Sequence, residues 1–572
     1  MNIDEIEFYT SEVINEDMKD IYTFLKPVDF AVVGFYLLIL IAIGYWVSFI
    51  KKRNSNENLF LAGHSLGWGS IGFTMWGTNV GPSMLIASAS IGYTTGVVAG
   101  NFGWYAFVFI FLLAVVFAPR YLGARVLTLP EFMGKRFGQS TRNILAWYTM
   151  ITILISWLSL TLFAGSILVS QMLNVPSWLS VIILVIIAAF FTVAGGLKAV
   201  AYTNVFQMLL LIVVSFILTV AGLIKIGGLE TVHEYASSGF GGLIISYWEQ
   251  FIGGVKGLYE KTPASYWNLL LPLNDRNYPW LAIILGYPIM GVWFWCTDQS
   301  MVQSVLGAKN LQQGQLGANF TGWLKILDVA LFIIPGIACF VLFPDLKDPD
   351  EAYLTMVTRL FPVGMTGLIM AVLIAALIST IDSALNSLST VFTMDIFVKK
   401  YRPDATQKEI INIGRTVTVF GAVLAVFLTL AIDSIKGLKL FDVFQAILGF
   451  IAPPMSVVFL FGVLWKKTTR RAANIALTAG TAFSLGTGVL YLWIFPSEKY
   501  TFWPHFLLLS FLIFLVIALV TYIVSRLDTG EGKNDQNSLD YGKLPLPGKK
   551  LIIPWLMLIV TMIGLYLVFN GH

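Results

Sequence analysis

Long apolar blocks repeat along the whole chain and are separated by short polar stretches. Many blocks reach roughly 18 residues or more, and about 20 apolar residues in a helix cross the hydrocarbon core of a bilayer. The pattern therefore predicts an all-α integral membrane protein with about fourteen transmembrane helices. The expected spans are residues 29–50, 67–92, 98–118, 142–172, 178–195, 200–226, 279–297, 318–343, 363–395, 411–432, 439–465, 472–495, 503–525 and 551–570.

The composition agrees with a membrane protein and excludes several other classes. Of 572 residues, 57% are hydrophobic and 12% are charged, whereas a soluble domain carries about 25% charged residues. The two cysteines, Cys296 and Cys339, lie in apolar segments, so we expect neither a disulfide framework nor a cysteine metal site. The chain contains neither an ATP-binding glycine loop nor a metalloprotease motif, so we expect neither a pump nor an enzyme. Residues 1–25 are polar and acidic and do not resemble a cleavable signal peptide.

The basic residues predict how the spans are oriented. Lys51, Lys52 and Arg53 follow the first span, and positive charge favours the cytoplasmic side, so the N-terminus is expected outside. The net charge of +4 is thus an orientation signal and not a sign of nucleic-acid binding. We expect a multi-pass protein of the cytoplasmic membrane of a bacterium, with both termini outside. The basic residues that fall inside in this scheme are Arg120, Arg125, Lys135, Arg136, Arg142, Lys399, Lys400, Arg402, Lys466, Lys467, Arg470 and Arg471.

The second and seventh spans contain helix-breaking residues near their middle. The two spans are five spans apart along the chain, and an odd separation means that they cross the membrane in opposite directions. Interrupted helices at matching positions of two inverted halves are typical of secondary-transporter sites, where freed carbonyls coordinate a cation. For either break alone, a packing kink is the alternative. The residues are Gly77, Asn79, Gly81 and Pro82 in the second span, and Gly286, Pro288 and Gly291 in the seventh.

Polar side chains inside the spans are functional candidates because burying them in hydrocarbon is costly. The ninth span carries a stripe at three- and four-residue spacing, which places it on one helix face. Hydroxyl and carboxylate oxygens suit a small cation, while the alternative is a stripe that only joins helices. Lys325 either donates to a substrate hydroxyl or forms a structural ion pair with Asp328. The stripe consists of Ser379, Asp382, Ser383, Asn386 and Thr390.

Several motifs resemble the sodium:solute symporter family, and within it the sodium/glucose cotransporter branch. The resemblance covers roughly residues 50–470. It rests on Phe60-Leu61-Ala62-Gly63, Gly195-Gly196-Leu197-Lys198-Ala199-Val200, Trp293-Phe294-Trp295-Cys296-Thr297-Asp298-Gln299, Phe392-Thr393-Met394-Asp395-Ile396 and Trp465-Lys466-Lys467-Thr468-Thr469.

The resemblance implies a five-plus-five inverted-repeat (LeuT-like) transporter fold with alternating access to a central site. The segment 227–278, rich in Gly, Tyr and Trp, is then an extracellular lid or cap. The expected organisation is 1–28 as an extracellular segment, 29–58 as a first peripheral helix and basic loop, 59–226 as the first repeat, 227–278 as the extracellular loop, 279–470 as the second repeat and 471–572 as peripheral helices.

The resemblance also implies site residues. The main sodium site would use backbone carbonyls near Gly77 and Val80, with Ala376, Ser379 and Thr380 opposite. A second sodium site would involve Asn204, where the family has an aspartate, with Asp382 and Ser383 near it. The expected substrate-binding residues are Asn79, Phe102, Phe294, Trp295, Lys325, Phe441 and Gln445.

Some positions depart from the sugar branch. Gly103 aligns with a sugar-binding glutamate, Met84 with a glutamine and Ala106 with a serine. Phe294 aligns with a gate tyrosine, so the hydroxyl of that gate is missing here. These departures leave the sugar open, and the change at Asn204 leaves open whether one or two sodium ions are used.

The sequence therefore predicts a sodium-coupled symporter that imports a small polar solute, most readily a monosaccharide. Inositol, a nucleoside, sialic acid or another organic acid is the alternative substrate, and a non-transporting solute sensor is a more remote alternative. Sodium is the expected coupling ion, although the sequence alone does not separate it from a proton. The lipid bilayer is the expected surrounding.

Overall fold

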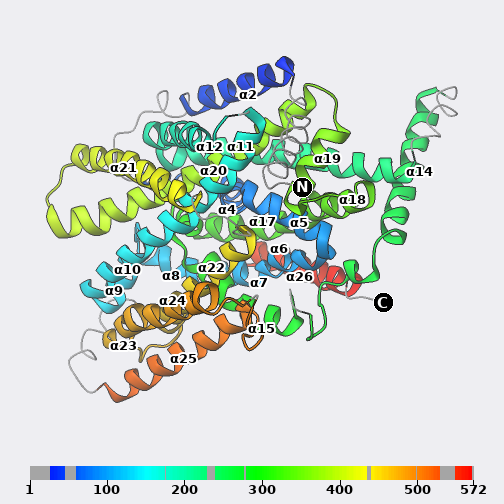
Figure 1. Ribbon diagram of the computed structural model, residues 1–572. Helices are drawn as coiled ribbons and strands as arrows, with labels where there is room; N and C mark the ends of the chain where they lie inside the picture. The colour runs from blue at the N-terminus through cyan, green and yellow to red at the C-terminus, as the bar shows by residue number, and fades with distance from the viewer. Residues whose placement is uncertain are drawn as a thin grey trace, which may run out of the picture.

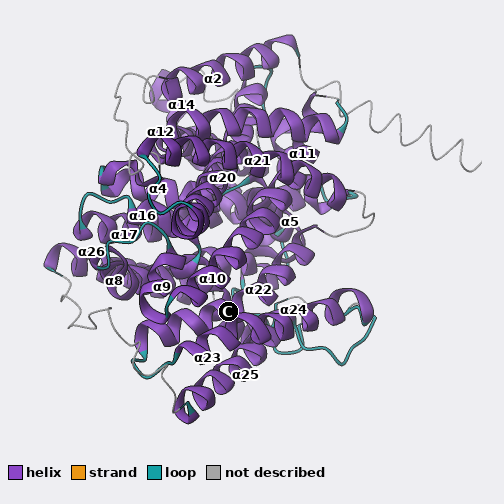
Figure 2. Cartoon of the chain, turned by 90° about the vertical axis from the view of Figure 1, so that its left-hand side faces the viewer, coloured by secondary structure: helices purple, strands orange, loops and turns teal. Residues whose placement is uncertain are grey.

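The computed structural model describes residues 26–45, 60–173, 175–228, 239–275, 278–433, 440–497, 499–528 and 548–569. These residues form helices and connecting loops, and their only β-type pairings are two isolated bridges, Leu66 with Ala308 and Leu271 with Pro279 (Figure 2). A helix satisfies its backbone N–H and C=O groups internally, which is what a segment in hydrocarbon requires.

The helices follow one another along the chain with short connections. The first group is α2 (Pro27–Tyr45), η2 (Ala62–His64), α4 (Trp68–Asn79), α5 (Pro82–Thr95), η3 (Gly96–Ala99), α6 (Gly100–Trp104), α7 (Ala106–Leu112), η4 (Leu113–Phe117), α8 (Ala118–Gly123), α9 (Leu129–Phe137), α10 (Gln139–Thr152), η5 (Ile153–Ser159), α11 (Leu160–Leu173), α12 (Ser177–Gly227), α14 (Gly239–Glu260) and η8 (Ala264–Trp267).

The second group begins after the connection that contains residues 276–277. It consists of α15 (Trp280–Val292), η9 (Trp293–Thr297), α16 (Gln299–Leu306), α17 (Leu311–Asp328), η10 (Val329–Ile333), α18 (Ile334–Leu342), η11 (Pro349–Glu351), α19 (Ala352–Leu360), α20 (Met365–Val391), η12 (Phe392–Tyr401), α21 (Gln407–Asp433), α22 (Leu440–Leu464), α23 (Arg470–Ile475), η13 (Ala476–Gly480), α24 (Thr481–Val489), η14 (Leu490–Ile494), α25 (Phe506–Leu527) and α26 (Lys549–Val568).

The expected membrane architecture is confirmed in its main features. Eleven helices among the described residues are long and apolar enough to cross a membrane, and two shorter apolar helices cover Pro27–Ile43 and Ser177–Phe190. Each expected span overlaps one or more described helices, and residues 46–50 of the first span lie outside the described residues. One long segment, Met84–Gly123, joins the end of the second expected span to the third. The count of fourteen and the division into two inverted repeats stay predictions.

The ninth expected span forms the centre of the bundle. In Met365–Tyr401, 94% of the most apolar stretch is buried inside the protein, against 28% in Gln407–Ile432. Figure 1 shows α20 within the bundle, with α2 and α25 at opposite edges. A polar stripe on this helix therefore faces protein and not lipid, which is where polar groups in a membrane are tolerated.

The break predicted in the second span is confirmed. Helix α4 ends at Asn79 and α5 begins at Pro82, with Val80 and Gly81 in non-helical conformations between them. Proline suits the first turn of a helix because its missing N–H would have no helical partner there.

The break predicted in the middle of the seventh span, at Gly286, Pro288 and Gly291, is wrong. Helix α15 continues through Pro288, and the chain leaves the helical conformation only at Asp298, after the π-helical segment η9. The two glycines have a packing role instead. A Cβ atom at Gly286 would lie 2.1 Å from the backbone oxygen of Leu507, and one at Gly291 would lie 2.3 Å from the ring of Phe109. Both glycines therefore allow a close approach of neighbouring helices.

A third break separates the fifth and sixth expected spans. The chain is helical throughout Ser177–Gly227 except at Gly196, whose φ of 57° and ψ of −162° are non-helical. Glycine adopts positive φ without a steric penalty, so the Gly-Gly signature produces a bend between two membrane segments.

The segment expected to form a lid contains regular structure. Helix α14 extends along the right-hand edge of the molecule in Figure 1, and a Cβ atom at Gly254 would lie 1.9 Å from the backbone oxygen of Leu223 on α12. In η8, the Tyr266 hydroxyl donates to the backbone oxygens of Tyr93 and Thr94 at the end of α5. The segment thus packs over the ends of two core helices, while its extracellular placement stays a prediction.

Replacing Gly286 with valine should destabilise the protein, because the new side chain meets the Leu507 backbone, which cannot move away as a side chain would. Overpacking of this kind costs about 1–3 kcal/mol, so the midpoint of thermal unfolding in detergent should fall. Gly486→Ala is the control, since no atom lies within 4 Å of its Cβ position. An unchanged midpoint for Gly286→Val would contradict the packing of α15 on α25.

Candidate functional site

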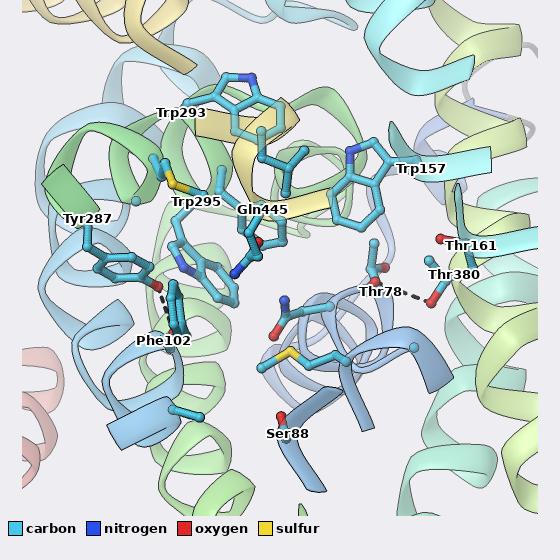
Figure 3. Close-up of a pocket in the computed structure, with 18 of the residues that line it drawn as sticks. Thr78, Ser88, Phe102, Trp157, Thr161, Tyr287, Trp293, Trp295, Thr380 and Gln445 are labelled. Atoms are coloured by element: carbon cyan, nitrogen blue, oxygen red, sulfur yellow. Dashed lines mark hydrogen bonds between the residues drawn. The ribbon is translucent and has the colours of Figure 1, made fainter. Parts of the chain in front are cut away.

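A cavity of about 110 Å³ opens beside the break of the second span. A water molecule needs about 10–15 Å³ on this measure, so the cavity has room for several waters or for a small solute. Figure 3 shows its walls, which come from α4, α5, η3, α6, η5, α11, α15, η9, α20 and α22. Its polar lining residues are Thr78, Asn79, Ser88, Thr161, Thr380 and Gln445, and its aromatic ones are Phe102, Trp157, Tyr287, Trp293, Phe294 and Trp295.

Five of the seven expected substrate-binding residues line this cavity. They are Asn79, Phe102, Phe294, Trp295 and Gln445. Lys325 is fully buried and does not line the cavity. The side chain of Phe441 lies outside the described residues.

Aromatic rings form much of the wall, and sequence reasoning missed three of them. The Phe294 ring lies 5.2 Å from that of Trp157 and 5.1 Å from that of Trp295. Across the cavity, the Tyr287 hydroxyl donates to the backbone oxygen of Phe102 at 2.6 Å (Figure 3). Trp293 stands inside the recognised motif, but nothing in the sequence separates Trp157 or Tyr287 from ordinary packing aromatics.

Trp157 and Phe294 both belong to π-helical segments, η5 and η9. Such segments insert an extra residue in a turn and often occur at functional sites. Here they bring two rings from distant parts of the chain together at one end of the cavity.

Lys325 lies behind the cavity wall in an ion pair with Asp328. Its Nζ also donates to Asn79 Oδ1 at 2.6 Å and lies 5.8 Å from the ring centre of Trp295. Trp76 Nε1 donates to the other carboxylate oxygen of Asp328 at 2.9 Å. Of the two interpretations of Lys325, the structure shows the ion pair, and Asn79 and Trp295 stand between the lysine and the cavity.

The glycine at position 103 makes room for this pair. A Cβ atom on Gly103 would lie 3.0 Å from Asp328 Oδ2. The carboxylate of Asp328 on α17 therefore reaches the place next to α6 where the sugar branch carries a glutamate. The absence of a side chain at Gly103 therefore leaves the space that the Asp328 carboxylate occupies.

The break between α4 and α5 releases backbone carbonyl groups. Pro82 has no N–H to offer the Thr78 carbonyl, and the Gly81 N–H bonds to the Asn79 oxygen and not to that of Gly77. The Gly77 and Thr78 carbonyls thus lack their usual helical donors. Carbonyl oxygens at the C-terminal end of a half-helix carry partial negative charge and attract cations.

Hydroxyl groups of α20 face these carbonyls. Thr380 Oγ1 lies 3.3 Å from the backbone oxygen of Thr78 and 3.3 Å from that of Ala376. Ser379 Oγ is buried, has no hydrogen-bond partner among the described residues, and lies 3.3 Å from the Cβ position of Gly77. Val80 is fully buried at the break. The structure brings the five expected sodium-site residues to one place, and the donor set of hard oxygens fits an alkali cation.

Thr390, at the C-terminal end of the α20 stripe, and its neighbour Ser387 have a structural role. Gln303 Nε2 donates to Thr390 Oγ1 at 2.7 Å, and Gln303 Oε1 accepts from Ser387 at 2.8 Å. These bonds join α16 to α20, as expected for a stripe that holds helices together.

The residues expected at a second sodium site contact different neighbours. Ser383 Oγ accepts from Thr78 Oγ1 at 2.9 Å beside the α4 break, whereas Asp382 accepts from Thr192 of α12 at 3.2 Å. Both amide atoms of Asn204 are buried without a hydrogen-bond partner among the described residues. No hydrogen bond among the described residues joins Asn204 to Asp382 or Ser383, and a second ion site stays a prediction.

At the non-helical residue after the seventh span, the Asp298 carboxylate offsets the positive N-terminal end of α16. Asp298 caps α16 by accepting from the backbone N–H groups of Ser300 and Met301 at 2.8 and 3.1 Å. Its other oxygen accepts from Trp157 Nε1 at 3.0 Å. The positive end of α16 is therefore filled by a carboxylate of the same chain.

Comparison with known proteins agrees with this geometry. Residues 59–480 match the Sodium:solute symporter family. The chain belongs to this family. It is 32% identical over 484 residues to sodium/glucose cotransporter 4 of Danio rerio, covering 80% of this chain and 71% of that protein.

Other members of the family are similarly related. Sodium/myo-inositol cotransporter 2 of Homo sapiens is 32% identical over 489 residues, with 81% of this chain and 70% of that protein covered. Sodium/glucose cotransporter 1 of Oryctolagus cuniculus is 31% identical over 533 residues, with 88% and 79% covered. The structure of a Na⁺-coupled sialic acid symporter in a substrate-bound outward-open state aligns with a TM-score of 0.70 at 16% identity, covering 88% of this chain and 98% of that chain. At that identity the likeness shows the fold alone.

Ser379→Ala tests the ion site of this symporter-family protein. The lost hydroxyl has no partner among the described residues, so unfolding without sodium should not become easier. The rise in unfolding midpoint when NaCl replaces KCl should disappear, because a ligand stabilises only the state that binds it. Ser389→Ala is the matched control. It breaks a 2.6 Å bond from the same helix to the Gly414 oxygen, so it should lower stability by about 1 kcal/mol and keep the sodium response. A normal sodium response in Ser379→Ala would argue against this site.

Lys325→Met should be more destabilising than the double change Lys325→Met/Asp328→Asn. The single change leaves a buried carboxylate without its counter-charge, which costs about 3–5 kcal/mol, whereas removing both charges leaves no unpaired ion. Thermal unfolding of the purified variants measures the difference. Equal midpoints would show that Asp328 does not depend on Lys325 for its charge balance. If Lys325→Met is the less stable variant, as expected, loss of transport in it does not by itself establish a substrate contact.

Proposed function

We propose that this protein is a sodium-coupled secondary active symporter of the cell membrane. The observation that carries the proposal is the buried Ser379 hydroxyl, which has no hydrogen-bond partner among the described residues and lies beside Gly77, where the α4 break releases backbone carbonyls. Oxygen atoms without partners at a buried site are costly unless a ligand completes them. Membership of the sodium:solute symporter family supports sodium as that ligand.

The ion site and the cavity share a wall. Thr78 and Thr380, which are bonded to each other beside the break, also line the cavity. An ion that holds α4 against α20 therefore also shapes the place where a solute binds. This shared wall supports coupling, since two ligands that favour the same arrangement increase each other's affinity.

We propose a neutral polyhydroxylated solute as the substrate, with a monosaccharide as the first candidate. The cavity combines aromatic rings, which pack on the apolar faces of sugar rings, with neutral hydroxyl and amide groups that can bond to hydroxyls. None of the described residues that line the cavity is charged, so the wall offers no cationic side chain to a carboxylate. These features support a neutral solute over sialic acid or another organic acid.

Myo-inositol is a second candidate. Relatives named as sodium/glucose and as sodium/myo-inositol cotransporters are equally similar to this chain, at 32% identity. Both solutes are neutral rings with several hydroxyl groups, so the chemistry of the wall suits either.

Transport would proceed by alternating access. Sodium would join the end of α4 to α20 and prepare the cavity, the solute would bind against Asn79 and Gln445, and the aromatic rings around Phe294 would then have to separate for release. One charge moving across about 100 mV is worth about 2.3 kcal/mol, and a tenfold sodium gradient adds about 1.4 kcal/mol. One sodium ion per cycle would thus allow on the order of 500-fold accumulation.

Uptake into proteoliposomes tests this function. Labelled hexoses, myo-inositol, a nucleoside and sialic acid would be compared with an inward sodium gradient, with an equal potassium gradient and with an inward proton gradient. We expect uptake of a neutral polyol only with sodium, and its loss in Ser379→Ala but not in Ser389→Ala. Uptake driven equally by potassium or by protons would reject sodium coupling. Solute binding without uptake under any gradient would favour a sensor.

A further inference from the structure

The cavity wall is uncharged, but a charged pair lies directly behind it. Among the described residues that line the cavity there is no Asp, Glu, Lys or Arg. Lys325 and Asp328 are 0% and 2% exposed, and the lysine contacts the back of the wall at Asn79 and Trp295. The electrostatic character of the cavity therefore depends on whether these two charges cancel.

Neutral partners hold the pair in a defined position. Asn79 Oδ1 accepts from Lys325, and Trp76 donates to Asp328. Whichever of the two residues carries the proton, the pair adds no net charge. Because the Asn79 amide oxygen already accepts from Lys325, the amide N–H groups are the part of this side chain that can bind a ligand. They are donors and suit a hydroxyl oxygen.

We infer that Asp328 sets the charge selectivity of the site, so that the carrier accepts neutral polyhydroxylated solutes and rejects their carboxylated counterparts. The inference rests on the proposed function for the identity of the site. Without Asp328, the lysine ammonium would lie buried with only Asn79 and an aromatic face beside it. A buried charge without a counter-charge is strongly disfavoured, and a carboxylate in the cavity would be the nearest group able to balance it.

Position 103 supplies the space for this carboxylate and also a way to move it. A Cβ atom there would lie 3.0 Å from Asp328 Oδ2. An aspartate at 103 combined with Asp328→Ala would therefore return a carboxylate to nearly the same place from a different helix. An asparagine at 103 in the same background has the same shape without the charge.

Sodium-dependent stabilisation of purified protein by D-glucose and D-glucuronate, and by D-galactose and D-galacturonate, measures the preference directly. The parent should respond to the hexoses and not to the uronates. In Asp328→Asn, the affinity ratio of uronate to hexose should rise at least about tenfold, or 1.4 kcal/mol. Lys325→Met/Asp328→Asn, which has neither charge, should show no such gain.

The pair of variants at 103 separates charge from shape. Gly103→Asn/Asp328→Ala should gain uronate binding, whereas Gly103→Asp/Asp328→Ala should keep the parent's preference for hexose. This comparison decides the question if Asp328→Asn alone does not fold. Equal ratios in the two variants, or no gain in Asp328→Asn, would overturn the inference.

The outcomes for the parent distinguish this inference from the proposed function. A parent that binds hexoses with the expected selectivity but shows no sodium-driven uptake would reject symport and leave the role of Asp328 standing. A parent that takes up uronates in preference to hexoses with sodium would reject the role of Asp328 and leave symport standing. A parent that binds neither member of either sugar pair, nor myo-inositol, would count against both.

Discussion

The structure depends on one unsatisfied stretch of backbone, the end of α4. In hydrocarbon each backbone carbonyl needs a partner, and a helix that stops in mid-membrane is tolerated only inside protein. Pro82 and Gly81 stop this helix and leave the carbonyls of Gly77 and Thr78 without helical donors. Helix α20, the most buried of the long helices that the structure describes, supplies a hydroxyl partner there, because Thr380 Oγ1 donates to the Thr78 carbonyl. The buried position of α20 thus lets its hydroxyl groups stabilise the end of α4 inside the protein.

Much of this arrangement can be predicted from the sequence because it is encoded locally. Asn79, Gly81 and Pro82 interrupt a long apolar block, and the spacing of Ser379, Asp382 and Ser383 places hydroxyl groups on a helix face. Pro82 has no N–H for the helix ladder, and Gly81 beside it adopts the extended conformation at which α4 stops. The break in the second span and the helical class therefore follow from short windows, and five of the cavity-lining residues follow from the family resemblance.

The remaining features depend on contacts between distant parts of the chain. In the sequence, Gly286 and Gly291 resemble a helix break. In the structure they allow close packing, because Leu507 and Phe109 occupy the space that side chains at these positions would need. The true break is at Asp298, which looks like an ordinary polar residue until its partner Trp157 is known. The sequence allows Lys325 to be a substrate donor or an ion-pair member. The structure shows the ion pair, held by Asn79 and Trp76, which are about 250 residues away in the chain.

The breaks at α4 and at α16 differ in the sign of the charge that they leave exposed. The end of α4 presents carbonyl oxygens with no counter-charge of their own, and this end is open to a cation. The start of α16 presents N–H groups, and Asp298 already occupies them. Beside the cavity, Asp328 likewise compensates Lys325. Among the described residues, these two positive groups are therefore compensated by carboxylates of the chain, while the carbonyl end of α4 has only hydroxyl groups beside it. That end attracts a cation, whose charge the surrounding oxygen dipoles stabilise, and the uncharged cavity wall suits a neutral solute.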